Sequence, residues 1–533
     1  MNKSYIALLV TTLAFMGVTW SAHSQTIVSG NVTTDTTWSG EVVMDGAIFV
    51  KNDATLTILP GTIVRGQPRT AAVSPGSTVG TPGVLIVTTS GLIDARGSAT
   101  NPIIFTTAAI DNDGNGVPDV SGSGFLLPYT PGDTFYDATP TTAPLSPLDQ
   151  AGNGNISLWG GIVLLGEAPT NLGADSGTFG ETTVEGLTVP GFPAADATYG
   201  GNLVHDFTGR MSYVSVRHAG DEIGESNELN GITLGGVGDA TQFDHIEIYC
   251  NFDDGIEWFG GNVDGSHLVV TFAGDDALDL DQGYSGINQF QAVTMPFFNL
   301  DDGENFGSKS GDKGGEWDGD DCSGNCSFRY DANIPSIDPG SVAFVPSGPA
   351  MYNITLLGAG AGNSNPAVVS AKSGNGTIQG KKGFRGAMHN SIIASTGDKE
   401  GADFTGVPTE VAAGEVQVFA STFTEAATTA ETLTVLNADP RNCNGSPSFA
   451  GLVNGDTGFD PKGFVNGAGV GVLDASLKAS PINPRVVNNN CTADGDSTGP
   501  DNAATYRGAF DSSVVKLWTS GWTALSMGGI LAD

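Results

Sequence analysis

An internal repeat of 22 residues constrains this chain more than any other feature. Asp244-His245-Ile246-Glu247-Ile248 aligns with Ser266-His267-Leu268-Val269-Val270 at this interval. The turn-like segment that follows recurs in step, because Asp253-Asp254-Gly255-Ile256-Glu257 aligns with Asp275-Asp276-Ala277-Leu278-Asp279. The other copies are Asp301-Asp302-Gly303-Glu304-Asn305, 26 residues later, and a weaker Asn230-Gly231-Ile232-Thr233. Repeats of this length are typical of solenoids, in which each repeat stacks on its neighbours.

The repeat has the length of one coil of a right-handed parallel β-helix, and we predict this all-β solenoid fold. Each coil hydrogen-bonds to the next, so equivalent residues stack about 4.8 Å apart. Inward positions then form apolar ladders, with Ile246 over Leu268 and Ile256 over Leu278. A leucine-rich repeat would show leucine at fixed offsets, and a calcium-binding β-roll would show glycine–aspartate nonapeptides. The chain shows neither pattern.

Short apolar runs that end near glycine or asparagine continue the strand pattern on both sides of the repeat. We therefore assign residues 25–510 to the β-helix. The last residues, 511–533, contain Trp518 and Trp522 and are expected to cap its C-terminal end, where strand edges would otherwise be exposed. The composition predicts loop insertions near residues 111–155, 167–202 and 307–340, and a partly helical stretch near residues 410–437.

The N-terminus has the layout of a secretory signal peptide over residues 1–24. Lys3 supplies the positive charge, residues 5–18 are mostly apolar, and Ala22-His23-Ser24 is a small-x-small cleavage site. A membrane anchor is the alternative, but the apolar stretch is shorter than the roughly 20 residues that span a bilayer. We therefore expect a mature chain without a membrane span, secreted to the extracellular space, the outer cell surface or the periplasm.

Four segments carry a resemblance to a known family. They read LWGGIVLLG at 158–166, NELNGITLGGVG at 227–238, DDGIEWFGG at 253–261 and YRGAF at 506–510, the last followed by Trp518 and Trp522. Here the chain resembles a family of exported β-helix proteins of Gram-negative bacteria, most of them uncharacterised, over most of residues 38–525. The resemblance implies the fold and export, and it brings no catalytic residues with it. Many relatives append a C-terminal sorting domain, which we do not expect in this chain.

The chain is strongly acidic, with a net charge of −37. This charge argues against nucleic acid and anionic lipid as partners, since both attract basic proteins. It is consistent with a solvated acidic surface or with sites for hard cations such as calcium.

Five cysteines are present, and an exported protein can form disulfides. We predict that Cys322 pairs with Cys326 and Cys443 with Cys491, because all four lie in loops. Cys250 follows an alternating apolar run and is expected to be a buried thiol. A zinc site is the rival interpretation, but the spacing fits none of the standard fingers.

The segment Asp111-Asn112-Asp113-Gly114-Asn115-Gly116-Val117-Pro118-Asp119 is a candidate calcium loop. Carboxylates at alternate positions, with glycine allowing a tight turn, can wrap calcium in oxygen ligands. We expect Asp111, Asp113, Asn115 and Asp119 to be these ligands. An acidic turn that holds no ion is the alternative, since the loop is shorter than an EF-hand and lacks its final glutamate.

The repeat also creates a ladder of carboxylates. We expect Asp254, Asp276 and Asp302 to be equivalent on three successive coils, and Glu257 to stack on Asp279. Like charges at this spacing repel unless they are protonated, solvated or bridged by a cation. A calcium-bridged or solvated ladder of turn-forming residues is one interpretation, and a sugar-binding surface is another.

Catalysis on an acidic polysaccharide is the third interpretation of this ladder, which we call the acidic ladder. Hydrolases use paired carboxylates, and lyases pair calcium with a lysine or arginine base. The candidate catalytic residues are Asp254, Asp275, Asp276, Asp279 and Lys309, with Lys313 close by. The Gly-His-Gly and Arg-x-Lys signatures of pectin hydrolases are missing.

His245 and His267 recur at coil spacing, which favours a role in a turn over a catalytic role. Trp258, Phe259 and Trp317 could stack on sugar rings, but aromatic residues of a solenoid more often belong to its core.

Two functions remain open from the sequence. The chain is a structural, adhesive or glycan-binding scaffold stabilised by calcium, or it is a calcium-dependent polysaccharide lyase or hydrolase acting on acidic glycans. We expect a monomer whose partner is a polysaccharide or a cell-surface glycan.

Overall fold

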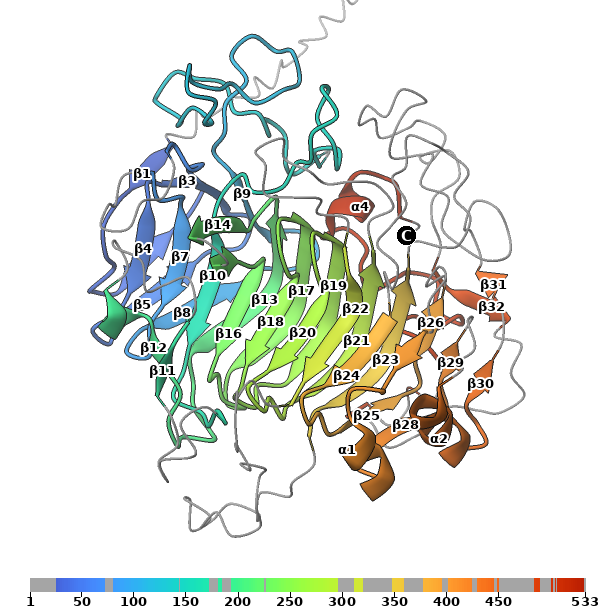
Figure 1. Ribbon diagram of the computed structural model, residues 1–533. Coiled ribbons are helices and arrows are strands. Elements are labelled where there is room, and N and C mark those ends of the chain that lie inside the picture. Colours follow the sequence, from blue (N-terminus) through green and yellow to red (C-terminus); the bar gives the residue numbers. More distant parts are fainter. Residues whose placement is uncertain are drawn as a thin grey trace, which may run out of the picture.

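The protein is a parallel β-helix, as the repeat predicts (Figure 1). This computed structural model describes residues 25–71, 80–142, 144–171, 181–184, 193–224, 227–295, 311–319, 348–358, 377–394, 401–423, 429–444, 448–449, 484–488, 500–501, 504 and 506–531. Two parallel sheets wrap around one core, and each coil contributes a short strand to one sheet and a bent or paired strand to the other.

Within the described residues, the smaller sheet, which we call sheet B, has nine parallel strands in the order of the chain. They are β4 (Ala47–Val50), β7 (Val84–Val87), β10 (Gly161–Leu165), β16 (Ile232–Gly235), β18 (Ile256–Phe259), β20 (Leu278–Asp281), β22 (Lys313–Asp318), β24 (Thr377–Lys381) and β27 (Ala402–Asp403).

The larger sheet, sheet A, forms two faces that meet at a corner. In the first coils the faces are separate strands: β1 (Thr26–Val28), β2 (Thr36–Trp38), β3 (Glu41–Met44), β5 (Thr55–Ile58), β6 (Ile63–Gly66), β8 (Leu92–Arg96) and β9 (Ile103–Thr107). In the middle coils one long strand covers both faces: β13 (Gly209–Arg217), β17 (Gln242–Asn251), β19 (Gly265–Ala273), β21 (Ile287–Thr294) and β23 (Ala350–Leu357). The last coils divide again into β25 (Gly386–His389), β26 (Ile392–Ala394), β28 (Val416–Phe419), β29 (Thr422–Phe423) and β30 (Cys443–Asn444).

The corner of sheet A is a column of residues with left-handed backbone conformation. The residues that follow one another up this column have φ between 48° and 60°, and none is glycine: Tyr213, His245, His267, Phe290, Asn353, Asn390 and Ala420. A left-handed residue turns the strand through the corner without breaking the ladder on either side. Asparagine tolerates this conformation best among these residues, and the chain uses it twice.

The core runs along the inside of the coils as continuous apolar ladders. Ile246 pairs with Leu268 in sheet A, and Ile256 pairs with Leu278 in sheet B, which confirms both predicted ladders. All four side chains are buried in the main hydrophobic cluster. Each fully buried aliphatic side chain of this kind stabilises the fold by about 1.5–3 kcal/mol relative to an exposed one.

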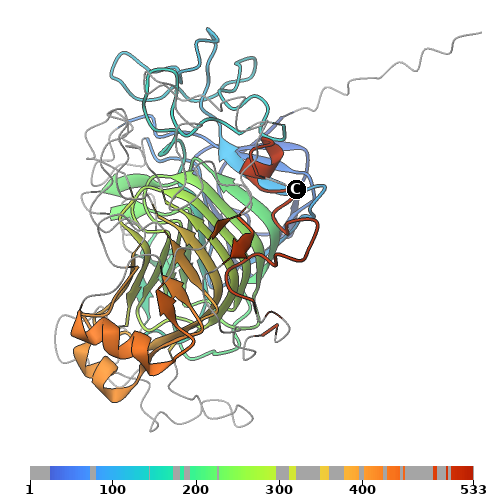
Figure 2. The ribbon, with the colours of Figure 1, turned by 90° about the vertical axis from the view of Figure 1, so that its right-hand side faces the viewer.

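The remaining elements lie outside the coils. The antiparallel pairs are β11 (Thr182–Thr183) with β12 (Thr198–Tyr199), β14 (Asp221–Gly224) with β15 (Asn227–Leu229), and β31 (Ser448–Phe449) with β32 (Val486–Asn488). The helices are the 3-10 turn η2 (Ala194–Asp196), α1 (Pro408–Ala413), α2 (Ala430–Ala438) and α4 (Ala524–Met527). Helices α1 and α2 lie on the side of the molecule opposite the loops of residues 111–155 (Figure 2).

The structure differs from the expected domain layout in two places. Strand β22 falls within residues 307–340, where an insertion was expected, and it pairs with β20 and β24 in sheet B. Its outward Glu316 and Asp318 and its two glycines hide the apolar alternation that marks the other strands. The other difference concerns residues 511–533, expected as a cap.

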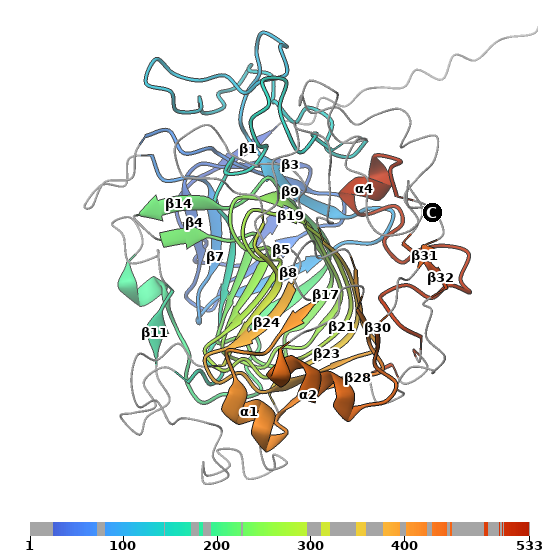
Figure 3. The same cartoon turned by 45° about the vertical axis from the view of Figure 1, so that its right-hand side comes forward.

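The C-terminal segment lies along the side of the β-helix instead of over its end (Figure 3). Asn353 at the corner donates its side-chain amide to the carbonyl of Tyr506, at 2.8 Å. Farther along, the backbone N–H of Ala524 donates to the buried carboxylate of Glu247, also at 2.8 Å. The segment therefore spans several coils, whereas α1 and α2 contribute Val411 and Val435 to the core at the last coils.

Candidate functional site

The acidic ladder lies at the turns that lead into sheet B and on the outer face of that sheet. Asp254 precedes β18 and Asp276 precedes β20 by the same distance. Gly255 follows Asp254 because the turn runs against the next coil: a Cβ there would come within 2.5 Å of the carbonyl oxygen of Ala277. Close stacking of the coils thus sets the position of these carboxylates.

Asp254 and Asp276 form hydrogen bonds that link successive coils. The backbone N–H of Asp254 donates to Oδ1 of Asn230, at 3.2 Å, and Asp254 Oδ1 accepts from the N–H of Asp276, at 2.8 Å. Asp276 Oδ1 in turn accepts from the N–H of Lys313. Both carboxylates are buried, so each satisfies a backbone donor that would otherwise lack a partner.

A second column of acidic residues runs beside these two aspartates on sheet B. Glu257 is paired in register with Asp279, and Asp279 with Glu316. Oxygen atoms of Asp254, Glu257 and Asp279 lie within 4.8 Å of one another, as do those of Asp275, Asp276 and Asp312. Oδ1 of Asp279 is buried and has no hydrogen-bond partner within the described part of the chain.

Burial and mutual repulsion penalise the charges of this ladder. Burial raises the pKa of Asp254 well above its ordinary value, and the charges of Asp253, Asp279 and Asp275 add to the shift. Burial likewise raises the pKa of Asp279, where Glu257 is the largest charged contributor. These carboxylates therefore favour a bound proton or a bound cation.

On the next coils of sheet B, lysines pair with the outward acidic side chains. Lys313 Nζ lies 2.7 Å from Asp312 and 3.7 Å from Glu316. Lys381 pairs with Glu316, and Lys382 Nζ lies 2.9 Å from Asp318. These ion pairs lie at the level of β22 and β24.

Asp302, a predicted member of the ladder, and Lys309, a candidate catalytic residue, lie outside the described residues. The position one coil beyond Asp276 is held by Lys313, since Ala277 N–H donates to the carbonyl of Lys313. The unequal length of this coil, which the sequence alignment could not resolve, produces this register.

The predicted calcium loop brings its three aspartates together. Oxygen atoms of Asp111, Asp113 and Asp119 lie within 4.8 Å of one another. Asn115 does not follow the expected arrangement, because its Oδ1 accepts from the N–H of Val117 at 2.7 Å and its side-chain amide donates to Asp113. The loop thus offers three carboxylates to a cation, whereas the amide oxygen of Asn115 is bound to a backbone N–H.

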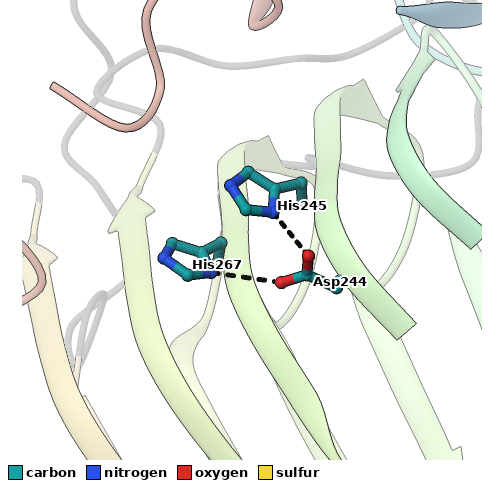
Figure 4. Close-up of side chains that lie close together, drawn as sticks. All are labelled: Asp244, His245 and His267. Atoms are coloured by element: carbon teal, nitrogen blue, oxygen red, sulfur yellow. Dashed lines mark hydrogen bonds and ion pairs between the residues drawn. The ribbon is translucent and has the colours of Figure 1, made fainter. Parts of the chain in front are cut away.

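The two histidines of the repeat share one carboxylate (Figure 4). Nδ1 of His245 is 2.7 Å from Oδ2 of Asp244, and Nδ1 of His267 is 3.1 Å from Oδ1. The hydrogen bonds to both histidines help to lower the pKa of Asp244 well below its ordinary value, against the effect of burial. The repeat alignment marked both histidines, but Asp244 has serine as its counterpart one coil on and was missed.

A family model for the pectate-lyase-like β-helix domain matches residues 30–117 and 149–457. The chain belongs to this family. No curated protein and no solved structure matches it. Membership fixes the fold and agrees with the β-helix resemblance noted in the sequence.

The aromatic residues of this pectate-lyase-like β-helix protein belong to its packing. Trp258 and Trp317 are buried in the main core, and Phe259 is buried in a smaller apolar cluster outside sheet B. These positions fit the core interpretation and leave none of the three rings exposed for stacking on a sugar.

Cys250 is a buried free thiol, as expected. Each predicted disulfide includes a residue outside the described part of the chain, namely Cys322, Cys326 or Cys491, so both pairings stay predictions. Within the described residues, no helix is long and apolar enough to cross a membrane.

Proposed function

We propose that this protein is a secreted or cell-surface scaffold that binds acidic glycans through calcium held on the acidic ladder. Membership of a pectate-lyase-like family supports a role with carbohydrate. The net charge of −37 would repel an acidic glycan unless cations bridge the two surfaces. Calcium can do this because it accepts six to eight oxygen ligands, and protein carboxylates need supply only some of them.

The carboxylate of Asp279 is the observation that carries this proposal. It has a buried oxygen without a hydrogen-bond partner among the described residues, and it lies within 4.8 Å of oxygen atoms of Asp254 and Glu257. Leaving a buried acceptor unpaired costs about 1–3 kcal/mol, and more when it is charged. A calcium ion at this point would satisfy Asp279 and offset the repulsion along the ladder.

A calcium-dependent lyase or hydrolase is the second candidate, favoured by the family. Lys313 lies beside the ladder, but it is a poor candidate for a base. Burial disfavours its charge, yet the hydrogen bond to Asp312 and the charges of Asp276, Asp312 and Glu316 outweigh that effect and raise the pKa of Lys313. A lysine base needs the opposite shift. Asp254 and Asp276, moreover, are engaged by backbone amides.

A screen of pectate, alginate and other polyuronides, with calcium and with a chelator, tests the proposal. We expect calcium-dependent binding without release of shorter or unsaturated products, and weaker binding by Asp279→Asn. Cleavage that Asp276→Asn abolishes would favour the enzyme. Failure of every acidic glycan to bind in calcium would contradict both candidates.

A further inference from the structure

Asp244, His245 and His267 form a cluster on sheet A in which both histidines share one carboxylate. Unlike the acidic ladder, which offers only oxygen atoms, this cluster also offers imidazole nitrogens. His245 and His267 occupy the left-handed corner column on successive coils, with φ of 54° and 55°. Their rings stack at 4.2 Å between centroids and 15° between planes. Equal backbone geometry on adjacent coils therefore places two imidazoles face to face.

Neighbouring aromatic rings hold this pair in place. Tyr213 stacks on His245 at 4.1 Å, and Phe290 lies over His267 at 4.9 Å. Trp518 of the C-terminal segment meets His267 edge to face at 5.0 Å. Rings restrained on these sides lose little freedom when they bind a ligand, which favours binding.

Three potential ligand atoms converge between the two coils. One ring nitrogen of each histidine and a carboxylate oxygen of Asp244 lie within 4.8 Å of one another, and Nδ1 of each ring is hydrogen-bonded to Asp244. Ser266 Oγ, 2.8 Å from Nδ1 of His267, adds a neighbouring oxygen. Two imidazole nitrogens and one carboxylate form a donor set that suits zinc and other first-row transition metals, with a fourth position open to water.

We propose that Asp244, His245 and His267 form a binding site for a divalent transition metal ion of the zinc class. The ion would replace the two N–H···O hydrogen bonds that now join the imidazoles to Asp244. Each neutral imidazole would then carry its proton on Nε2. Within the described residues, the hydrogen bonds of both rings are made at Nδ1, so a proton placed on Nε2 displaces no partner at that atom.

The choice of metal separates this site from the acidic ladder. Carboxylate-only clusters prefer calcium, whereas imidazole nitrogen favours zinc, cobalt and copper. The site is therefore tested in protein saturated with calcium. Zinc binding is measured by calorimetry, and cobalt binding by the visible absorption that reports coordination geometry and nitrogen ligands.

Asparagine is the informative replacement for each histidine. Asn353 and Asn390 occupy the same corner column with φ of 55° and 50°, so His245→Asn and His267→Asn keep the backbone conformation. His205→Asn is the matched control, because His205 also lies beside a carboxylate, 2.7 Å from Asp239, but outside the proposed site. The melting temperature of each variant establishes that it is folded.

We expect one zinc or cobalt ion at this site per chain. Loss of a residue that hydrogen-bonds to a metal ligand typically weakens metal binding by about 10–100-fold. Loss of a ligand itself, either His245 or His267, should therefore weaken binding by about a hundredfold or more. Asp244→Asn should weaken it as well, and His205→Asn should not. Absence of zinc and cobalt binding in the folded wild type would overturn the proposal. So would binding that survives in the folded His245→Asn/His267→Asn double variant.

Discussion

At the scale of single residues, Asp279 and Glu316 show why the acidic ladder calls for a cation. They are paired in register on neighbouring coils. Glu316 has a lysine partner in Lys381, whereas Asp279 has a buried oxygen without a partner in the part of the chain that the structure describes. Within these residues, a carboxylate on one coil has a lysine partner and its neighbour on the preceding coil has an unpartnered oxygen.

Removing the charge of Asp279 should stabilise the calcium-free protein. In a chelator, Asp279→Asn is expected to raise the free energy of unfolding by on the order of 1 kcal/mol, because a buried group without a partner costs more when it is charged. Thermal melts of the variant and the wild type measure this difference. A lower melting temperature for the variant in chelator would mean that the Asp279 charge is not a cost to the fold.

The pH dependence has a definite sign. The pKa values of Asp254, Asp276 and Asp279 are raised in the folded state, mainly by burial. Above an unfolded pKa of about 4, the folded state then binds more protons than the unfolded state, so this contribution to stability falls as pH rises. Without calcium, acidification from about pH 7.5 to about 5.5 should therefore favour the folded state through these groups.

His218 acts in the opposite direction, because burial lowers its pKa to about 4. Its neutral form is favoured in the fold, and that stability is lost as pH falls below the unfolded value of about 6.5. Comparison with Asp279→Asn isolates the ladder, since both proteins keep His218. The melting temperature of the wild type should respond more favourably to acid than that of the variant, and calcium should remove the difference. Identical pH profiles in chelator would count against the raised pKa of Asp279.

At the scale of elements, the turn before each strand of sheet B sets the spacing of the ladder. Gly274 lies in the turn between β19 and β20, and a Cβ there would overlap the carbonyl oxygen of Phe252 on the preceding coil. Gly274→Ala should force the coils apart and cost about 1–3 kcal/mol. Gly122→Ala is the control, because nothing lies within 4 Å of its Cβ position. Equal melting temperatures for the two variants would contradict this close packing.

The same elements show what a sequence can and cannot reveal. The repeat predicts Ile246 over Leu268 and Glu257 beside Asp279, because strict spacing within a coil fixes register. The coil after β20 is longer, and the pairing of β20 with β22 sets its register. The outward charges and the glycines of β22 conceal the apolar alternation that would mark it as a strand. The pairing of Asp244 with two histidines depends on a corner conformation that residue spacing does not encode.

At the scale of the whole molecule, the C-terminal segment ties distant coils together. Glu247 is fully buried and accepts hydrogen bonds from Ser215 Oγ, at 2.5 Å, and from the N–H of Ala524, at 2.8 Å. Arg217 is also fully buried and favours the Glu247 charge. One carboxylate thus joins sheet A to the start of α4.

Glu247→Ala should release this segment, because it removes the acceptor of the Ala524 N–H and of Ser215 Oγ. Leaving a buried donor without its partner costs about 1–3 kcal/mol. Limited proteolysis followed by mass spectrometry should detect faster cleavage within residues 506–531, with the coils more resistant. Protection of the segment equal to that in the wild type would show that Glu247 does not anchor it.

The central claim, that the coils align carboxylates into a calcium site, is tested most directly by calcium titration calorimetry of three proteins. Asp113→Ala should lose only the binding that belongs to the loop of Asp111, Asp113 and Asp119. Asp279→Asn should lose only the binding that belongs to the acidic ladder, so the two variants together account for two separate sites on the wild type. Calcium binding by Asp279→Asn that equals wild-type binding in stoichiometry and affinity would contradict the account.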